Sequence, residues 1–464
     1  MQNTSVEKIK RIVAAQKKFF GSGATLDIRF RKRMLCRLLD ALEAWEERIL
    51  EALWKDLHKS AQEAYLTELG IIKGEIRTHI KNLSKWAARE KVHSPLTLFP
   101  SRSYTVKEPL GCSLIISPWN YPVQLLLNPL VGAISAGCTA VLKPSPYVPQ
   151  VSETLGKMVA ETFSEEYIAV VQGNRDVNTA LLDERWDIIF FTGSPSLGKT
   201  VMAAAARNLT PVVLELGGKS PCIVARTADV RCAARRIAWG KTLNSGQTCI
   251  APDYLIVHKD VKDAFIEAFA QEIKSLHGDD IFASQYYVHM VNRKAFDRVS
   301  SYLAQGKILY GGSTDESQMC IEPTILECTQ TDLPVLQEEI FGPIFPMIVL
   351  DGDDAQFSTR ATRFIVDREK PLAFYFFGDE KMGWDIVRNT SSGGGCINDV
   401  IMHIANGNMP FGGVGNSGMG RYHHRYSFEC FSHTRSIVVS PVWPDMPFRY
   451  MPYRFFKLVK KLLR

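Results

Sequence analysis

A chain of 464 residues is too long for one compact core and favours two or three domains. Apolar residues make up 46% and charged residues 22%, as in globular proteins. Ten scattered cysteines without a C-x-x-C pair argue against a disulfide scaffold or a metal site and favour a reducing, cytoplasmic compartment. The net charge of +6 arises after Asp445, where six basic residues follow without an acid, so the body of the chain does not predict nucleic-acid binding.

The N-terminal part of the chain changes from helical to strand-like patterning. Residues 5–90 carry Ala, Leu, Glu, Lys and Arg at helical spacing, which predicts two or three long helices. Residues 109–142 contain no charged residue, but prolines and asparagines interrupt the run of about 20 apolar residues that a membrane-spanning helix needs. We therefore expect a buried strand, loop, helix and strand in this stretch.

Short apolar runs then alternate with helical stretches, which predicts βαβ units around a parallel sheet. The alternation runs through residues 139–216 and resumes after the following glycine pair as a second α/β unit. Residues 390–420 are dense in Gly, Ser and Asn and are predicted to form loops. The G-x-G-x-x-G match at Gly413, Gly415 and Gly418 follows no strand, so it is interpreted as a loop and not as a dinucleotide fingerprint.

One segment matches the phosphate loop of nucleotide hydrolases letter for letter. Residues 193–200, GSPSLGKT, fit G-x-x-x-x-G-K-[ST] and follow the apolar run of residues 188–191. Such a hydrolase also needs a metal-holding acid after an apolar strand, and Asp351 in IVLD is a candidate. A pattern with four fixed positions also occurs by chance, so the motif alone leaves the question open.

Three polar side chains stand in settings with both a chemical and an ordinary interpretation. Cys249, in the polar loop NSGQTCIAP, is either a nucleophile or a small buried thiol. Glu215 ends the apolar strand PVVLEL, as a general base or as one partner of a strand-end ion pair. Asn120, between two prolines in SPWNYP, either donates its amide to an oxyanion or satisfies its own turn.

Together and in this order, the motifs resemble the aldehyde dehydrogenase superfamily, from the N-terminal helices to about residue 440. The matching motifs are ISPWNYP, LKPS, FTGSPSLGK, LELGGKSP, NSGQTC, EEIFGP and PFGGVGNSGMG. The segments INDVIMH and GMGRYHHRYSFECFSH resemble the class 3 branch, which acts on fatty and aromatic aldehydes. The resemblance implies an aldehyde substrate, NAD or NADP as cofactor, no metal, and a homodimer joined through an extended arm.

The resemblance also implies an α/β fold divided into four parts. These are a Rossmann-type cofactor domain (1–80 and 104–218), an α/β catalytic domain (219–395), a small β oligomerisation arm (81–103 and 396–440) and a basic amphipathic tail (441–464).

By the same resemblance, the Cys249 thiolate attacks the aldehyde carbon, and the Asn120 side chain and the Cys249 backbone N–H hold the oxyanion. Hydride leaves for the nicotinamide, and Glu215 activates the water that hydrolyses the remaining thioester.

The cofactor contacts are implied in the same way. Glu339 holds the nicotinamide ribose, Phe341 packs near the ring, and Lys143 binds the adenosine ribose. The remaining expected cofactor residues are Trp119, Gly193, Ser194 and Gly198, where Gly193 and Ser194 open a helix whose N-terminus faces the phosphates. Relatives often carry Glu three residues after the lysine, where this chain has Pro146. We therefore expect NADP to be tolerated, since no carboxylate repels its 2′-phosphate.

The C-terminus and the overall function each keep an alternative. Residues 454–464, RFFKLVKKLLR, predict a basic amphipathic helix, so residues 449–464 either contact an anionic membrane surface or dock on the dimer itself. The rival functions are a phosphate-loop nucleotide hydrolase, an acylating dehydrogenase that uses coenzyme A, and a catalytically silent relative. A hydrolase leaves Asn120, Glu215 and Cys249 unexplained, and an acylating enzyme needs no base for water.

Overall fold

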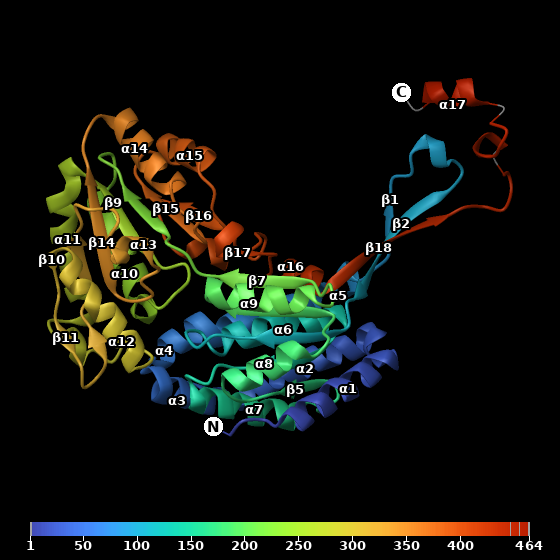
Figure 1. Ribbon diagram of the computed structural model, residues 1–464, viewed down its shortest axis with the longest axis horizontal. Helices are drawn as coiled ribbons and strands as arrows, with labels where there is room; N and C mark the ends of the chain where they lie inside the picture. Colours follow the sequence, from blue (N-terminus) through green and yellow to red (C-terminus); the bar gives the residue numbers. More distant parts are fainter. Residues whose placement is uncertain (1, 446, 454, 463–464) are drawn as a thin grey trace.

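The computed structural model describes residues 2–445, 447–453 and 455–462, which form two α/β lobes and an extended arm (Figure 1). The first lobe contains a six-stranded sheet of order β17-β7-β6-β3-β4-β5. All neighbours pair in parallel except β17, which pairs antiparallel with β7 and sets Gly418 opposite Glu215. The strands are β3 (Cys112–Ile116), β4 (Thr139–Lys143), β5 (Ile168–Val170), β6 (Ile188–Gly193), β7 (Val212–Leu216) and β17 (Gly418–Met419).

Helices surround this sheet, as the alternating pattern predicted. The crossover helices are α6 (Gln124–Ala136), α7 (Pro149–Thr162), α8 (Arg175–Asp183) and α9 (Pro195–Ala206). The N-terminal segment forms α1 (Val6–Gly21), α2 (Ile28–Ala44), α3 (Glu46–Leu57), the short α4 (Ala61–Ala64), a π-helical turn (Tyr65–Leu69) and α5 (Gly70–Trp86). Four of these helices, α1, α2, α3 and α5, have 12 or more residues, whereas two or three long helices were predicted.

The second lobe contains a seven-stranded sheet of order β10-β13-β14-β9-β8-β15-β16, parallel except for β10. Its strands are β8 (Pro221–Val224), β9 (Tyr254–His258), β10 (Lys307–Tyr310), β13 (Thr324–Glu327), β14 (Ile344–Leu350), β15 (Ala373–Phe377) and β16 (Gly394–Ile397). Its other elements are α10 (Val230–Thr242), α11 (Lys262–His277), α12 (Arg293–Ser300), α13 (Pro334–Gln337), α14 (Asp354–Val366), α15 (Glu380–Asn389), β11 (Thr314–Asp315) and β12 (Cys320–Ile321).

Residues 390–420 are not all loop, which corrects the prediction. Both β16 and β17 lie in this segment. Gly395 lies so close to β15 that a Cβ there would be 2.2 Å from the Phe374 carbonyl oxygen. At Gly418 a Cβ would be 2.2 Å from the Leu214 carbonyl oxygen. These strand positions require glycine, so they lack the apolar pattern by which a strand is recognised.

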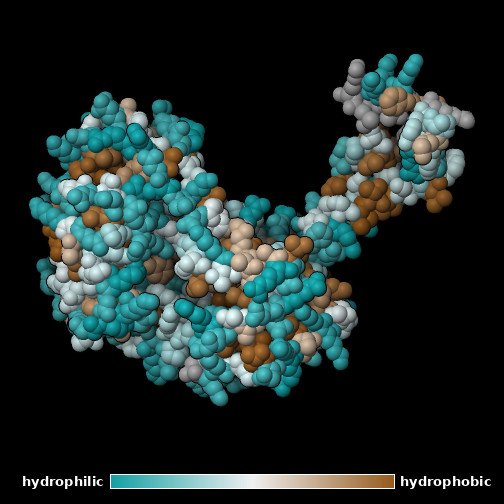
Figure 2. Space-filling model, viewed as in Figure 1, coloured by the Kyte–Doolittle hydropathy of each residue, from teal (hydrophilic) through white to brown (hydrophobic). Residues whose placement is uncertain are grey.

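The arm is a three-stranded antiparallel sheet of order β1-β2-β18 that projects from the first lobe (Figure 1). It is built from β1 (Glu90–Val92), β2 (Arg102–Pro109) and β18 (Ser432–Val439), and α16 (Arg425–Cys430) leads into it. The predicted domain boundary at residue 104 falls within β2. Figure 2 shows apolar residues gathered along the arm.

The last described helix, α17 (Phe456–Leu462), lies at the end of the arm (Figure 1). Phe455 and Phe456 are exposed there. The rest of the predicted apolar face, Leu458, Val459, Leu462 and Leu463, lies outside the side chains that the structure describes. Within the described ranges, no helix is both long and apolar enough to cross a membrane.

Candidate active site

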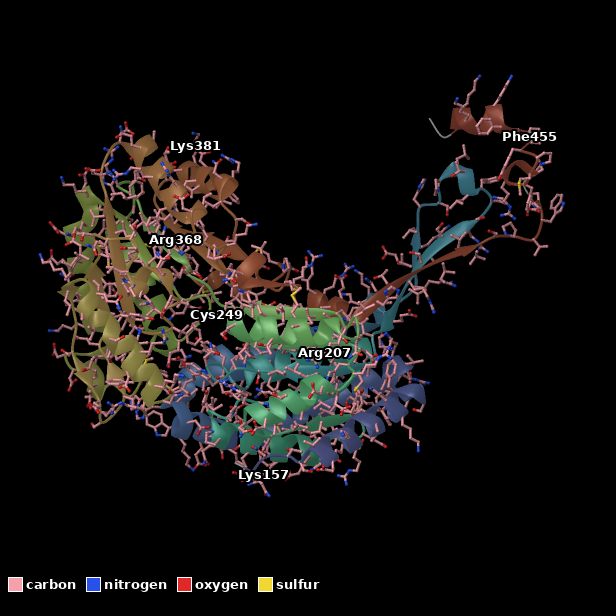
Figure 3. The ribbon with its side chains drawn as sticks, in the orientation of Figure 1. Lys157, Arg207, Cys249, Arg368, Lys381 and Phe455 are labelled. Atoms are coloured by element: carbon pink, nitrogen blue, oxygen red, sulfur yellow. The ribbon has the colours of Figure 1, made fainter. Side chains whose placement is uncertain are left out.

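Cys249 lies at the junction of the two lobes (Figure 3). The chain reaches it through a turn in which Asn244, Ser245 and Gly246 all have positive φ (52°, 52° and 71°). At Gly246 a Cβ would be 2.4 Å from the Gly342 carbonyl oxygen, so only glycine fits. Consecutive left-handed residues are costly for ordinary side chains, and such strain is concentrated at functional sites.

Burial is the main reason that the pKa of the Cys249 thiol rises to about 12, and the carboxyls of Glu339 and Glu215 raise it further. Cys249, Glu215 and Glu339 therefore lie close enough together for the two carboxyls to act on the thiol. A thiol with this pKa is protonated at neutral pH, which is its less reactive form.

Asn120 is buried on the loop that follows β3, and its side chain is fixed on the Cys249 loop. Its Nδ2 donates to the Gln247 carbonyl oxygen at 2.9 Å. The neighbouring residues are joined in the same way, because the hydroxyls of Tyr121 and Thr248 lie 2.6 Å apart. The structure thus brings the amide of Asn120 and the loop of Cys249 together.

Glu215 is buried in β7, and neither of its carboxylate oxygens has a hydrogen-bond partner among the described residues. Burial holds its pKa well above the usual range. The strand-end ion pair that the sequence left open is therefore not formed. A buried carboxyl without a partner is a typical proton acceptor of an active site.

Cys249 lines a cavity of about 790 Å³. Tyr121 and Thr248 also line it, as do the titratable side chains of Glu63 and His277. Most of the wall is apolar and includes Leu66, Ile71, Leu125, Trp239, Leu243 and Phe411.

Glu339 and Phe341, the two residues predicted to hold the nicotinamide half of the cofactor, do not line this cavity, but Glu339 is close enough to Cys249 to raise the pKa of its thiol. Glu339 accepts a hydrogen bond from the Gly218 backbone N–H at 3.1 Å, and burial raises its pKa to about 8. At Gly217 a Cβ would be 2.1 Å from the Glu339 carboxylate, so the glycine makes room for it. Phe341 has a φ of 49° and meets Trp119 edge to face at 5.4 Å.

The remaining predicted cofactor residues lie at or just after the carboxyl ends of β4 and β6, the edge at which open α/β sheets bind ligands. Lys143 is buried, its Nζ donates to the Pro144 carbonyl at 2.9 Å, and burial lowers its pKa to about 8. Ser194 is the exposed N-cap of α9. A Cβ at Gly193 would be 2.6 Å from the Phe191 ring, and one at Gly198 would be 2.8 Å from Leu216. A buried amine with a single described acceptor and an open helix N-terminus fit ribose hydroxyls and phosphates.

The phosphate-loop interpretation does not survive in this structure. Asp351 follows β14 of the seven-stranded sheet, whereas Gly193 ends β6 of the six-stranded sheet. The Asp351 carboxylate pairs with Arg360 at 2.6 Å on the surface. Acid and loop therefore belong to different lobes.

Sequence reasoning missed Lys219 and Asp253, which form a largely buried ion pair at 2.5 Å. Lys219 also donates to the carbonyl oxygens of Val335 and Glu338, and Asp253 accepts from the Ile340 N–H. The pair thus braces the segment that carries Glu339. The position of Lys219 directly after the glycine pair was the only signal in the sequence.

Comparison with known proteins identifies the class. Residues 1–437 match the model of the aldehyde dehydrogenase family, and the chain belongs to that family. It is an NAD(P)-dependent aldehyde dehydrogenase. The phosphate-loop match therefore does not indicate a nucleotide hydrolase. In this dehydrogenase the motif forms the end of β6 and the start of α9, with Ser194 as the N-cap.

Individual relatives show which aldehyde dehydrogenases the chain is similar to. The chain is 44% identical to 4,4'-diaponeurosporen-aldehyde dehydrogenase of Staphylococcus aureus, with 97% of each chain covered. It is 41% identical to the dimeric NADP-preferring aldehyde dehydrogenase of Canis lupus familiaris, covering 96% of this chain and 98% of that one. A solved structure titled as the substrate-bound state of Staphylococcus aureus AldH matches with a TM-score of 0.95 at 43% identity, over 98% of this chain and 99% of that one.

Proposed function

We propose that this dehydrogenase oxidises medium- or long-chain aliphatic or aromatic aldehydes to carboxylic acids, with Cys249 as its nucleophile. The observation that carries this is the cavity of about 790 Å³ whose mostly apolar wall includes Cys249. A wall of this kind favours an apolar aldehyde body by burial. The relatives named for apolar substrates, such as the diaponeurosporen aldehyde, agree with this choice.

Each catalytic residue has one task in the proposed reaction. The Cys249 thiol loses its proton to water, its sulfur bonds to the carbonyl carbon, and the carbonyl oxygen becomes an oxyanion. The Asn120 amide and the Cys249 backbone N–H hold this oxyanion. A bound nicotinamide supplies the hydride acceptor. Glu215 then takes a proton from the water that attacks the thioester, so that the acid leaves and the thiol is restored. Burial raises the pKa of Glu215, and its oxygens have no partner among the described residues, so the carboxylate is a better proton acceptor than an exposed one.

The cofactor residues are proposed on the fit described above. Glu339 and Lys143 would hold the two riboses, Phe341 and Trp119 would flank the nicotinamide, and the start of α9 would face the phosphates. NADP is expected to be tolerated because Pro146 offers no carboxylate to repel a 2′-phosphate. An NAD to NADP efficiency ratio above about a hundredfold, roughly 2.8 kcal/mol, would contradict this expectation.

The decisive assay is absorbance at 340 nm with the purified protein, an aldehyde series of increasing chain length, and NAD or NADP in parallel. Efficiency should rise with chain length until the cavity is filled. Equal efficiency for a two-carbon and a ten-carbon aldehyde would contradict the substrate class. Absence of reduced cofactor across the series, with the fold intact, would favour the catalytically silent alternative.

We infer that the chain is a homodimer joined through the arm. β18 is an edge strand whose apolar side chains Ile437, Val438 and Val439 are exposed. An exposed apolar edge strand readily pairs with another chain. Light scattering should report twice the chain mass, and Val438→Lys should shift the protein toward monomer. A monomeric native protein would reject this inference.

Residues 449–464 are proposed to contact an anionic membrane surface, because Phe455 and Phe456 are exposed beside basic residues at the end of the arm. Flotation with anionic and neutral vesicles, with and without these residues, tests the proposal. Binding only to anionic vesicles and only with the tail supports it. Identical behaviour of both proteins favours docking of the tail on the dimer.

A further inference from the structure

A fully buried ion pair lies beside the loop that carries Asn120, outside every motif that pointed to the family. Lys59 and Glu68 are both 0% exposed, and Nζ of Lys59 lies 2.8 Å from Oε1 of Glu68. Lys59 precedes α4, and Glu68 lies within the π-helical turn Tyr65–Leu69. Single π-helical turns are rare and occur frequently at functional sites.

The remaining hydrogen bonds that the structure records for these two charged groups go to the Asn120 loop and to the first residue of α6, which follows it. Lys59 Nζ donates to the backbone carbonyl oxygen of Asn120 at 3.0 Å. Glu68 Oε2 accepts from the backbone N–H groups of Val123 at 2.8 Å and Gln124 at 3.2 Å. The pair therefore grips the loop at Asn120 and again three residues later.

Stability does not explain why both charges are buried here. Desolvation of two ions offsets most of their attraction, so a buried pair contributes little net stability compared with apolar residues of the same shape. A pair whose other bonds all fix one catalytic loop has a different use. Catalytic groups need placement to within about 0.5 Å, and supporting hydrogen bonds provide it.

A second contact ties the same carbonyl to the nucleophile turn. The Asn120 carbonyl oxygen also accepts from Nδ2 of Asn244 at 3.0 Å. The backbone N–H of Asn244 donates in turn to Glu63 Oε1 at 2.9 Å. Residues 59–68 thus hold the Asn120 loop and the cysteine turn from one side.

We propose that Lys59 and Glu68 are positioning residues that aim the side chain of Asn120 at the oxyanion. The inference rests on the oxyanion role proposed for Asn120. The hydrogen bonds to the Asn120 carbonyl and to the following N–H groups restrain the backbone from which the side chain extends. The side-chain amide then stays within reach of the cysteine loop, where it donates to the Gln247 carbonyl oxygen.

The test is a double-mutant cycle on the rate of acylation, measured as the first turnover of reduced-cofactor formation. Lys59→Met with Glu68→Gln removes both charges at nearly constant volume and leaves an amide oxygen for Val123 and Gln124. We expect acylation to slow by about tenfold or more in the native background, because a misplaced donor loses transition-state contacts. In the Asn120→Ala background the same change should alter the rate less than twofold.

Lys73→Met with Glu46→Gln is the matched control, because this ion pair joins a buried lysine to a half-buried glutamate and the hydrogen bond recorded for it does not involve the Asn120 loop. It should leave acylation within twofold of native. The melting temperature of each variant verifies folding. If the double variant does not fold, the cycle is run with Glu68→Gln alone, which keeps the lysine and the side-chain shape.

The outcomes separate the two levels of the argument. A slow Asn120→Ala variant combined with a fast Lys59/Glu68 variant overturns the positioning role only. Equal slowing in both backgrounds also overturns it, since the pair would then act independently of Asn120. An Asn120→Ala variant as fast as the native enzyme overturns the oxyanion role and this inference with it.

Discussion

Asn120 and Glu215 serve the same thiol in the proposed reaction, yet the structure restrains them in opposite ways. The backbone carbonyl of Asn120 accepts two hydrogen bonds and its amide donates a third. Glu215 is equally buried, and both of its oxygens lack a partner among the described residues. An oxyanion donor works by staying in place, whereas a base that serves a later step has to accept a proton. The difference in restraint therefore matches the difference in task.

The largest effect is expected when the Cys249 thiol, which both Asn120 and Glu215 serve, is removed. Cys249→Ser should lower aldehyde oxidation by roughly 10⁴-fold or more, because a serine hydroxyl without an adjacent base is a poor nucleophile. Steady-state formation of reduced cofactor measures the loss, and circular dichroism verifies the fold. A folded variant that retains a tenth of native activity would show that another residue is the nucleophile.

Glu215→Gln should separate the two steps. Acylation does not need a base for water, so the first turnover should persist as a burst of about one reduced cofactor per subunit. The following steady state should fall by roughly 10²–10⁴-fold, the usual contribution of a general base. Rapid mixing at 340 nm measures both phases. Loss of the burst with the steady state would assign Glu215 to acylation instead.

Asn120→Ala should act on the earlier step. Removal of one oxyanion donor typically costs roughly 10²–10³-fold, and here the loss should appear in the burst itself. The contrast with Glu215→Gln is the shape of the time course, with a slow first turnover in one variant and a fast one in the other. Identical time courses would remove the distinction between the two residues.

The sequence was sufficient to predict the three proposed catalytic residues but not the ion pair that holds the Asn120 loop. The motifs led to Cys249, Asn120 and Glu215 because each stands at a strand end or in a stiff turn, where polar residues are conspicuous. Lys59 and Glu68 lie in a charged, helix-rich segment, and their spacing looks like an ordinary solvated face. Their burial depends on the packing of the N-terminal segment against a loop some 60 residues away, which local pattern does not encode.

The fold was also predicted only in part. Alternating apolar and helical runs were sufficient to predict the parallel sheets, since each βαβ unit is local in sequence. They could not assign β14 and β6 to different sheets, and so Asp351 remained a plausible partner of the phosphate-loop match. The glycine-dependent strands β16 and β17 were read as loops, because the contacts that require glycine are made with distant strands.

The smallest expected effect concerns Glu63, which holds the turn before Cys249 through the N–H of Asn244. Burial raises its pKa to about 7, against the opposing effects of Lys59 and the Asn244 N–H, while Glu68 raises it further. From about pH 4.5 to 7 the unfolded chain therefore gives up a proton that the folded chain keeps, so the native protein loses stability as pH rises. Glu63→Gln does not titrate and still offers an oxygen to Asn244.

The variant should consequently gain stability relative to the native protein across that window, with no gain well below pH 4.5 and the full gain above pH 7. Urea unfolding of both proteins at pH 5 and pH 8 measures the difference, and comparison within one pH cancels the titration of Glu215 and Glu339. Acylation should change by less than about threefold, since the amide preserves the contact that holds the cysteine turn. A native protein that gains stability relative to the variant between pH 5 and pH 8 would mean that Glu63 is ionised and favourably paired, and that the restrained side of the site contains a third buried charge.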